Sequence, residues 1–306
     1  MGNKIIVVFK NRPTKHGLSA GDSGFFLLSS RVHARKPLGC FFIIRQTIMK
    51  ILMDGNGLQT RIHVQNERRL QTFLAQLEDI PFCVVDFSPE LPLAKSLLNN
   101  YDVLVITTRH GEEYSYSIEE ITGVTDFVRQ GGGLLLMSNH GDLPGHNIND
   151  MTKQDAVLAR QFGIEIENSW FANSKSGILS EFSASDLLVT HPIICGGLGV
   201  GEEPIRSIVT NNCCSLVSAD AVPIINLPSQ MIDHRNGLPA HGRNFAMALD
   251  AEANSALDRM GRVVVVADSG FIGTEGTTNP GPGLIEKGDN RRFVQNVIRW
   301  LGREIG

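Results

Sequence analysis

The sequence predicts an α/β fold, a doubly wound and mostly parallel sheet with an antiparallel extension. From about residue 49 onward, short apolar runs alternate with segments of helical periodicity, the order that right-handed β-α-β crossovers produce. Several of the runs, most clearly residues 134–137, have no polar break, which is typical of parallel strands buried on both faces. The 306 residues are enough for one large domain of this class.

The first half of the pattern alternates regularly. Strands are expected at residues 51–53, 82–85, 103–107 and 134–137, and helices at 67–77, 91–98 and 117–129. The last of these helices begins at Ser117, with Glu120 three residues later as in a capping box. The glycines from Gly131 onward end it.

The second half is less regular. A helix is expected at residues 155–162, and short strands at 205–209, 215–217, 222–225 and 245–249. Many turn signals separate these strands, which favours an antiparallel extension of the sheet. A further buried strand is expected at 262–267, and Asp289 is expected to cap the final helix.

Composition excludes several classes of protein. The net charge of -4 gives no general attraction to nucleic acid. No apolar run approaches the ~20 residues that span a membrane. The five cysteines are odd in number and form no C-x-x-C motif, which fits neither a disulfide framework nor a zinc site. We therefore expect a cytoplasmic protein with reduced thiols and no cofactor.

The N-terminal segment differs from the rest. Nine of the 28 basic residues but only one of the 32 acidic residues, Asp22, lie within residues 1–50. We divide the chain into an extension, residues 1–48, and a domain, residues 49–306. Three explanations of the extension stay open: a targeting presequence, translation from a start upstream of Met49, or an added strand at residues 5–9.

Four parts of the domain carry a resemblance to a known family. They are residues 101–106, residues 128–136, the segment Thr190-His191-Pro192-Ile193, and residues 261–269 together with 296–301. In their order and spacing they resemble a class I glutamine amidotransferase-like domain of the non-glutaminase branch. That branch includes trehalose-utilisation-type proteins and a domain shared by gliding-motility and intraflagellar-transport proteins. The resemblance implies a flavodoxin-like, amidotransferase-like fold over about residues 50–301.

The sequence departs from the family at the nucleophile. Active amidotransferases carry a cysteine on a tight turn flanked by small residues, and that turn aligns near Ser138. Its flanks are Leu136 and His140, and the sequence has no cysteine close to it. Glutamine hydrolysis needs a thiolate activated by a neighbouring histidine, so glutaminase activity is not expected.

Polar residues cluster where the predicted strands end, the edge at which open parallel sheets bind ligands. Candidates for a catalytic role are Ser138, His140, His110 and Glu112. Candidates for ligand binding are Asp54, Asn56, Arg109, Asn139, Asp142 and Asp268.

Three kinds of chemistry stay open for this set. His140, Asp142 and His146 are of types that bind zinc, although the glycines and proline between them leave their geometry unspecified. Ser138 is a nucleophile candidate, with His140 or His110 as base and Glu112 as orienting carboxylate, but the turn lacks the usual glycines. Otherwise the cluster binds an anionic or sugar-like ligand, or a loop of a partner, without chemistry.

We expect the third: a domain that binds a small polar ligand or a protein partner at the carboxyl edge of the sheet. The alternative is a hydrolase or lyase acting on a carbohydrate or amide through His110, His140 and a carboxylate, with or without a metal. Whether the protein is an enzyme and whether it forms a homo-oligomer both stay open. His191, which precedes Pro192, is expected to be structural.

Overall fold

The computed structural model describes residues 48–58, 60, 80, 83–88, 92–175, 179–196, 203–250, 261–273 and 284–306. The chain divides into two units, Met1–Arg45 and Gln46–Gly306, and all of the described residues belong to the second. The helix expected at 67–77 and the strand expected at 5–9 lie outside the described residues. No helix of the described part is long and apolar enough to cross a membrane.

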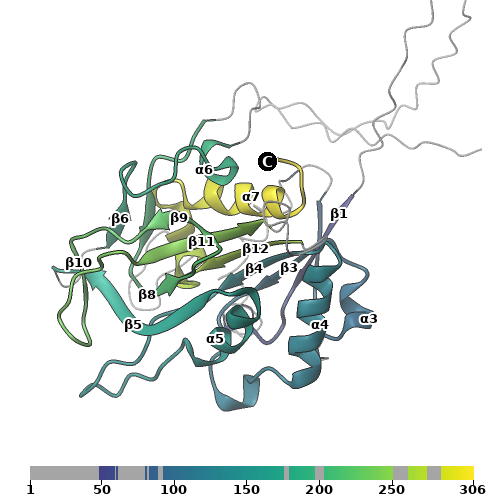
Figure 1. Cartoon of the computed structure of the whole chain (residues 1–306), viewed down its shortest axis with the longest axis horizontal. Helices are drawn as coiled ribbons and strands as arrows, with labels where there is room; N and C mark the ends of the chain where they lie inside the picture. The colour runs from purple at the N-terminus through teal and green to yellow at the C-terminus, as the bar shows by residue number, and fades with distance from the viewer. Residues whose placement is uncertain are drawn as a thin grey trace, which may run out of the picture. The chain divides into compact units, whose positions relative to one another are not determined.

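One large mixed sheet organises the domain (Figure 1). Its strands follow the order β10-β5-β8-β11-β12-β4-β3-β1-β2, and β9 pairs with β11. The run β2-β1-β3-β4-β12 is parallel, in the order of a flavodoxin-like doubly wound sheet. From β12 onward every pairing is antiparallel. The predicted fold class is confirmed, including the antiparallel extension.

The strands of this sheet are short except for β5. Their bounds are β1 Met49–Met53, β2 Cys83–Phe87, β3 Val103–Ile106, β4 Gly133–Met137, β5 Glu165–Asn173, β8 Asn212–Val217, β9 Val222–Asn226, β10 Met231–Asp233, β11 Asn244–Asp250 and β12 Arg262–Val266. A separate pair consists of β6 Ser180–Phe182 and β7 Ile208–Thr210.

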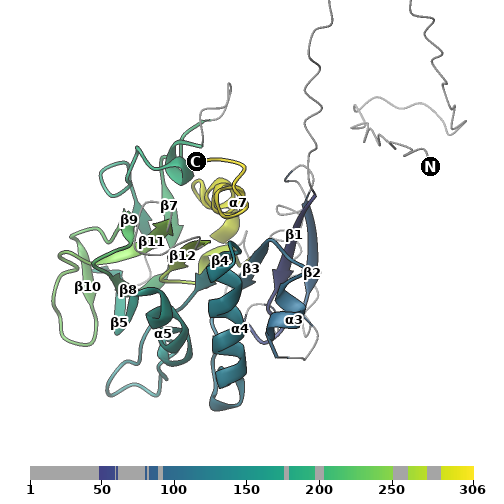
Figure 2. The same ribbon diagram turned by 45° about the vertical axis from the view of Figure 1, so that its right-hand side comes forward.

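Helices cover both faces of the sheet (Figure 2). Their bounds are α3 Lys95–Leu98, α4 Ile118–Arg129, α5 Lys153–Ala159, α6 Pro192–Cys195 and α7 Asn290–Leu301. Short 3-10 turns are η1 Glu112–Tyr114, η2 Arg160–Phe162, η4 Gly270–Ile272 and η5 Leu284–Glu286. Figures 1 and 2 place α7 and α6 on one face, and α3, α4 and α5 on the other. This two-sided cover explains why β3, β4 and β12 are buried along their whole length.

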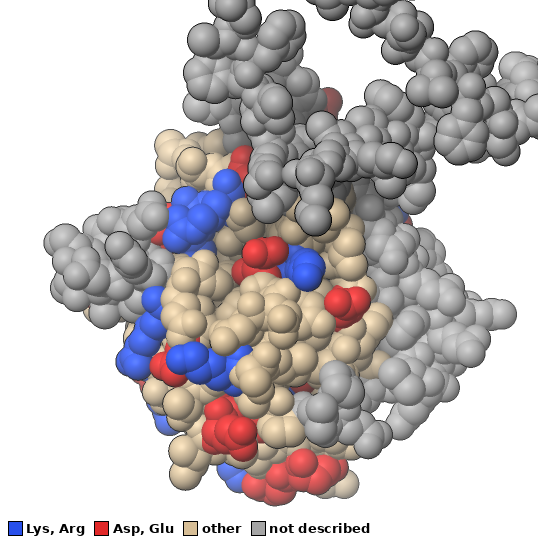
Figure 3. All heavy atoms as spheres, turned by 90° about the vertical axis from the view of Figure 1, so that its right-hand side faces the viewer, with Lys and Arg blue, Asp and Glu red and all other residues tan. Residues whose placement is uncertain are grey.

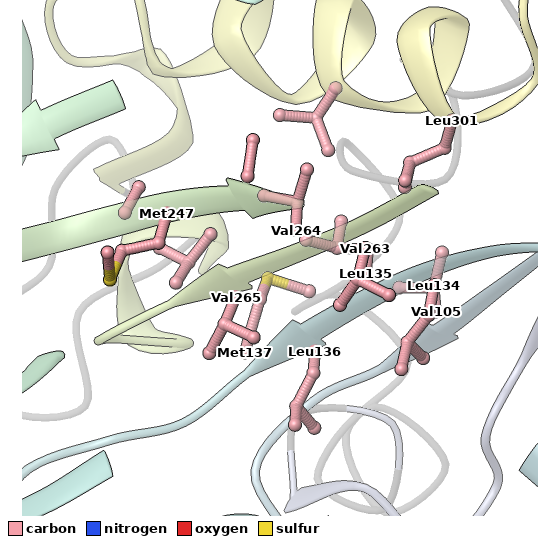
Figure 4. Packing of buried hydrophobic residues seen from close by; sticks show 14 of the residues in the cluster. Val105, Leu134, Leu135, Leu136, Met137, Met247, Val263, Val264, Val265 and Leu301 are labelled. Carbon is pink, nitrogen blue, oxygen red and sulfur yellow. The ribbon is translucent and has the colours of Figure 1, made fainter. Parts of the chain in front are cut away.

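The core is built from the central parallel strands (Figure 4). Side chains of β4 and β12 alternate between the faces of the sheet, and α7 packs over one of these faces. A Cβ on Gly133 would lie 2.8 Å from the Cβ of Leu301 in α7. The glycine therefore lets α7 approach the start of β4 closely.

The capping box predicted for α4 is present. The Ser117 hydroxyl accepts a hydrogen bond from the Glu120 backbone N–H at 3.1 Å, and Glu120 Oε2 accepts one from the Ser117 N–H at 2.9 Å. The cap satisfies two N–H groups at the helix start. It also fixes the Glu120 carboxylate. The oxygen that is not part of the cap, Oε1, reaches the edge of the sheet at which the parallel strands end.

Some predicted details were wrong. Asp289 does precede α7, but its carboxylate accepts hydrogen bonds from the N–H groups of Arg206 and Ser207, not from the first turn of the helix. Helix α3 covers only the end of the segment expected at 91–98. Strands β5, β6 and β10 were not predicted at all, because polar residues interrupt β5, and β6 and β10 are only three residues long and show no apolar run.

Candidate functional site

The carboxyl ends of β1, β3, β4 and β12 meet at one edge of the sheet, as the parallel order requires. Asp54 follows β1, Thr107 follows β3 and Ser138 follows β4. Asp268 stands two residues beyond the end of β12. The predicted candidates divide here into a buried group and an accessible group.

Arg109 forms the centre of the buried group, with 1% of its side chain exposed. Its Nε and Nη2 donate to the two oxygens of Asp54 at 2.8 and 3.0 Å, and Nη2 also donates to Glu120 Oε1 at 2.9 Å. The guanidinium carbon lies 4.1 Å from the centroid of the Tyr116 ring. Burial raises the pKa of Glu120, but the hydrogen bond and charge of Arg109 and the hydrogen bonds from the backbone N–H groups of Ser117 and Leu93 together outweigh it, so the pKa lies below its usual value. Asp54 and Arg109, both expected to bind a ligand, thus bind each other.

Asp155, in the first turn of α5, belongs to the same buried group and was not predicted as a site residue. Its carboxylate accepts hydrogen bonds from Thr108 Oγ1 at 2.6 Å, from the Arg109 N–H at 3.1 Å and from the Tyr116 hydroxyl at 3.4 Å. Burial raises the pKa of Asp155 to about 7, although these hydrogen bonds oppose it. In the sequence this residue is only the start of an expected helix, so no signal placed it beside the strand ends.

Ser138 is fully buried, and its Oγ has no partner at normal hydrogen-bond geometry. Asp155 and Cys214 are its neighbours, near enough for the serine hydroxyl to lower the pKa of each. No cysteine lies near this turn in the sequence, but the expectation was wrong for the folded chain, because β8 brings Cys214 next to Ser138. The reason is that β8 passes the end of β12, where the Cys214 N–H donates to the Ala267 carbonyl at 3.1 Å.

Cys214 is nevertheless a poor nucleophile. Its thiol is buried and donates to the Ala267 carbonyl at 3.2 Å. Burial raises its pKa well above the usual value, which keeps the sulfur protonated at neutral pH. Neither Ser138 nor Cys214 is thus an exposed, activated nucleophile of the kind that acyl transfer needs.

His140 leads the accessible group and is only partly buried. Its ring stacks on Trp170 of β5, with centroids 4.3 Å apart and planes 14° apart. Its Nδ1 lies 2.8 Å from the Gly141 carbonyl, an acceptor, so Nδ1 carries the hydrogen and Nε2 is left as an acceptor. Burial lowers the pKa of His140, and the charge of nearby His110 lowers it further. At neutral pH His140 is therefore uncharged.

The His140 loop is anchored to an irregular part of β5. The pairing of β5 with β8 shifts register between Glu167 and Phe171. There the Ser169 carbonyl accepts from the Gly141 N–H at 2.8 Å, and Asn168 Oδ1 accepts from the Asp142 N–H at 3.0 Å. A Cβ on Gly141 would lie 2.1 Å from Asn168 Oδ1, so only glycine fits. The anchoring fixes His140 against Trp170.

The remaining candidates are Asn139, which is buried, and Asp142, His146 and Glu112, which are at least partly exposed. Asn139 Oδ1 accepts from the His140 N–H at 2.8 Å, and Asp142 pairs with Arg235 Nε at 3.0 Å. His146 is exposed on the same loop. Glu112 pairs with Lys153 at the surface, where both side chains are mostly exposed.

Two further ligand candidates are bound within the protein. Asp268 is buried, accepts from Thr210 Oγ1 and from the Gly270 N–H, and has a pKa that burial raises to about 6. The backbone N–H of Asn56 donates to Asp54 Oδ1 at 3.2 Å. Within the described ranges no three His, Cys, Asp or Glu side chains converge as metal ligands would. The metal alternative built on His140, Asp142 and His146 stays a prediction, in which Asp142 would have to leave its ion pair with Arg235 and His146 would have to turn in from the surface.

No protein-family model matches the chain. No curated protein sequence matches it either. Its fold is nevertheless similar to that of solved structures. The mmIFT52 N-terminal domain superposes with a TM-score of 0.57 and 13% identity, over 82% of this chain and 97% of that one.

Two bacterial structures overlap more loosely, each with a TM-score of 0.48. One is a cytoplasmic protein of Salmonella typhimurium LT2, with 14% identity over 83% of this chain and 99% of that one. The other is a thuA-like protein of Bacteroides uniformis, with 12% identity over 84% and 92%. The likeness to the mmIFT52 N-terminal domain agrees with the resemblance found in the sequence and, at 13% identity, extends to the fold alone.

Proposed function

We propose that this domain binds a small, uncharged, hydroxyl-rich ligand, such as a sugar, at the surface formed by His110, His140 and Trp170, and that it does not hydrolyse glutamine. The stack of His140 on Trp170 carries the proposal. It is a rigid aromatic platform beside a second histidine, at the edge where sheets of this topology bind ligands.

The charges of the side chains at this site favour an uncharged ligand over an anion. An anion would be drawn to Arg109, but two carboxylates already neutralise that guanidinium, and 1% of it is exposed. His140 adds no positive charge at neutral pH, because its pKa is lowered. Its Nε2 offers an acceptor and the Asp142 carboxylate is partly exposed, which suits hydroxyl donors.

The burial of Ser138 and Cys214 supports binding over hydrolysis. A hydrolase would require a water or serine nucleophile next to a histidine with an orienting carboxylate. Glu112, the carboxylate expected for that role, is paired with Lys153 at the surface. A hydrolase built on Ser138 therefore loses its expected orienting carboxylate, whereas the alternative through His110, His140 and another carboxylate stays open.

Trp170 makes the proposal testable by fluorescence. We would titrate the protein with glucose, trehalose and inositol, and with gluconate and glucosamine as charged counterparts. We expect a saturable change with at least one neutral probe, abolished by His140→Ala. His146→Ala, on the same loop but exposed, is the matched control and should bind as the parent does.

Two outcomes contradict the proposal. One is preferential binding of gluconate, which would mean that the site selects anions. The other is equal loss of binding in His140→Ala and His146→Ala, which would place the ligand elsewhere on the loop.

A further inference from the structure

Asp155 is a fully buried carboxyl group that, within the described residues, has no ion-pair partner. The Arg109 guanidinium binds Asp54 and Glu120, and the contact of Arg109 with Asp155 is made by its backbone N–H. The charged side chains that Figure 3 shows lie at the surface, where water solvates them. Asp155 has neither a cation nor solvent to compensate a charge, so its ionised form is unfavourable.

The hydrogen bonds around Asp155 require one more hydrogen than its neighbours supply. Its Oδ1 lies near two donors, the Arg109 N–H at 3.1 Å and the Tyr116 hydroxyl at 3.4 Å. Its Oδ2 lies 2.6 Å from Thr108 Oγ1. Thr108 Oγ1 is also 3.1 Å from the Met151 carbonyl, which can only accept. A hydroxyl group has a single hydrogen, so one of these two Thr108 contacts lacks a hydrogen unless the carboxyl group supplies it.

We propose that Asp155 keeps its proton in the folded protein up to about neutral pH, and that this proton completes a chain of hydrogen bonds that holds the His140 loop, residues 139–151. With the proton in place, Asp155 Oδ2 donates to Thr108 Oγ1, which donates to the Met151 carbonyl. The Met151 N–H in turn donates to the His140 carbonyl at 3.2 Å. When the proton leaves, the Thr108 hydrogen turns to the carboxylate, and the Met151 carbonyl loses its donor. Rising pH therefore loosens the loop whether or not a ligand binds there, so the inference does not depend on the proposed function.

The groups around Asp155 set the pH at which its proton leaves. Burial raises the pKa of Asp155 to about 7, against the hydrogen bonds that the group receives and the charge of Arg109. Tyr116 and Cys214 also face it, and burial raises the pKa of each well above its usual value, so both stay uncharged. Other charged groups nearby, including one on β5, which packs on α5, are paired: Asp54 and Glu120 with Arg109, and Glu167 with Arg243.

The first test compares urea unfolding of the full parent chain with that of Asp155→Asn between pH ~5 and ~9. Asparagine has the shape of the protonated carboxyl group, its NH2 group can donate to Thr108, and it does not titrate. Since the proton is bound in the folded chain but released on unfolding, its stabilising effect is present at low pH and is lost as the pH rises through the pKa of the folded state. We expect the unfolding constant of the parent, divided by that of the variant, to rise about tenfold per pH unit from pH ~5 and to level off above pH ~7. A carboxylate that is ionised throughout would give a constant ratio.

The second test follows the His140 loop by hydrogen exchange at the Met151 N–H. At pH ~6 the parent and Asp155→Asn should exchange alike, whereas at pH ~8.5 the parent should exchange about fivefold faster, because the Met151 carbonyl has then lost a hydrogen bond. Thr108→Val interrupts the chain of hydrogen bonds and should exchange faster at both pH values. Asp268→Asn removes another buried carboxyl group and is the matched control, which should exchange as the parent does.

Carbon-13 NMR of the aspartate carboxyl groups decides the protonation state without Asp155→Asn, should that variant fail to fold. In Asp268→Asn we expect one buried aspartate to titrate at a pH of about 7. The proposal is overturned if no aspartate does so, if the ratio of unfolding constants does not change with pH, or if Met151 exchange in the parent matches that in Asp155→Asn at pH ~8.5.

Discussion

Replacing Arg109 by methionine tests whether the buried charge cluster is structural. The variant leaves Asp54, which is fully buried, and Glu120, which is 5% exposed, without their shared cation. Removing one partner of a buried ion pair costs about 3–5 kcal/mol, because an uncompensated charge stays behind. Two carboxylates are involved here, so we expect a loss toward the upper end of that range.

Urea unfolding followed by circular dichroism would measure this loss. The control is Arg235→Ala, which breaks the ion pair with Asp142 at a partly exposed site and should cost at most about 1 kcal/mol. Adding Asp54→Asn to Arg109→Met should recover part of the stability, since one buried charge is then gone. If Arg109→Met lowers the free energy of unfolding by less than about 1 kcal/mol, the reasoning is refuted. The fold would then not depend on Arg109, and this side chain would be available for a ligand.

Three further predictions concern stability. Burial and Arg262 lower the pKa of His191 to about 4, so the folded state favours the neutral ring. The stability from the neutral ring is present above pH ~6.5, and about 2–3 kcal/mol of it is lost as the pH falls toward 4. His191→Asn can still cap α6 but has no group that titrates, so this pH dependence should be absent when urea unfolding of the variant is compared at the two pH values. His140→Ala should leave the melting temperature nearly unchanged by calorimetry, whereas a large drop would mark His140 as structural. A chain shortened to begin at Met49 should be soluble and unfold cooperatively, and aggregation would show that residues 1–48 belong to the core.

The sequence predicted the parallel half of the sheet well, for a physical reason. Strands such as β4 and β12 are buried on both faces, so their apolar runs are visible without knowledge of their partners. The cap of α4 was equally visible, because Ser117 and Glu120 interact within one turn. The strand β5 was missed because its alternation is interrupted by the register shift that carries Trp170.

The sequence predicted which residues lie at the candidate site but not which side chains contact each other there. The strand ends placed Ser138, His140 and Arg109 at one edge of the sheet. Nothing local indicated that Asp155 from α5 and Cys214 from β8 would bury Ser138, since those contacts join segments far apart in the chain. The pairing of Arg109 with Asp54 spans 55 residues and has no periodic signature either.

Release of ammonia from glutamine, measured on the folded full chain at neutral pH, tests the central claim most directly. We predict no release above the uncatalysed rate, because the turn expected to hold a nucleophile carries the buried Ser138 and because Cys214 is buried and protonated. Clear turnover that is lost on Cys214→Ala, or on substitution of any other single cysteine, would contradict it.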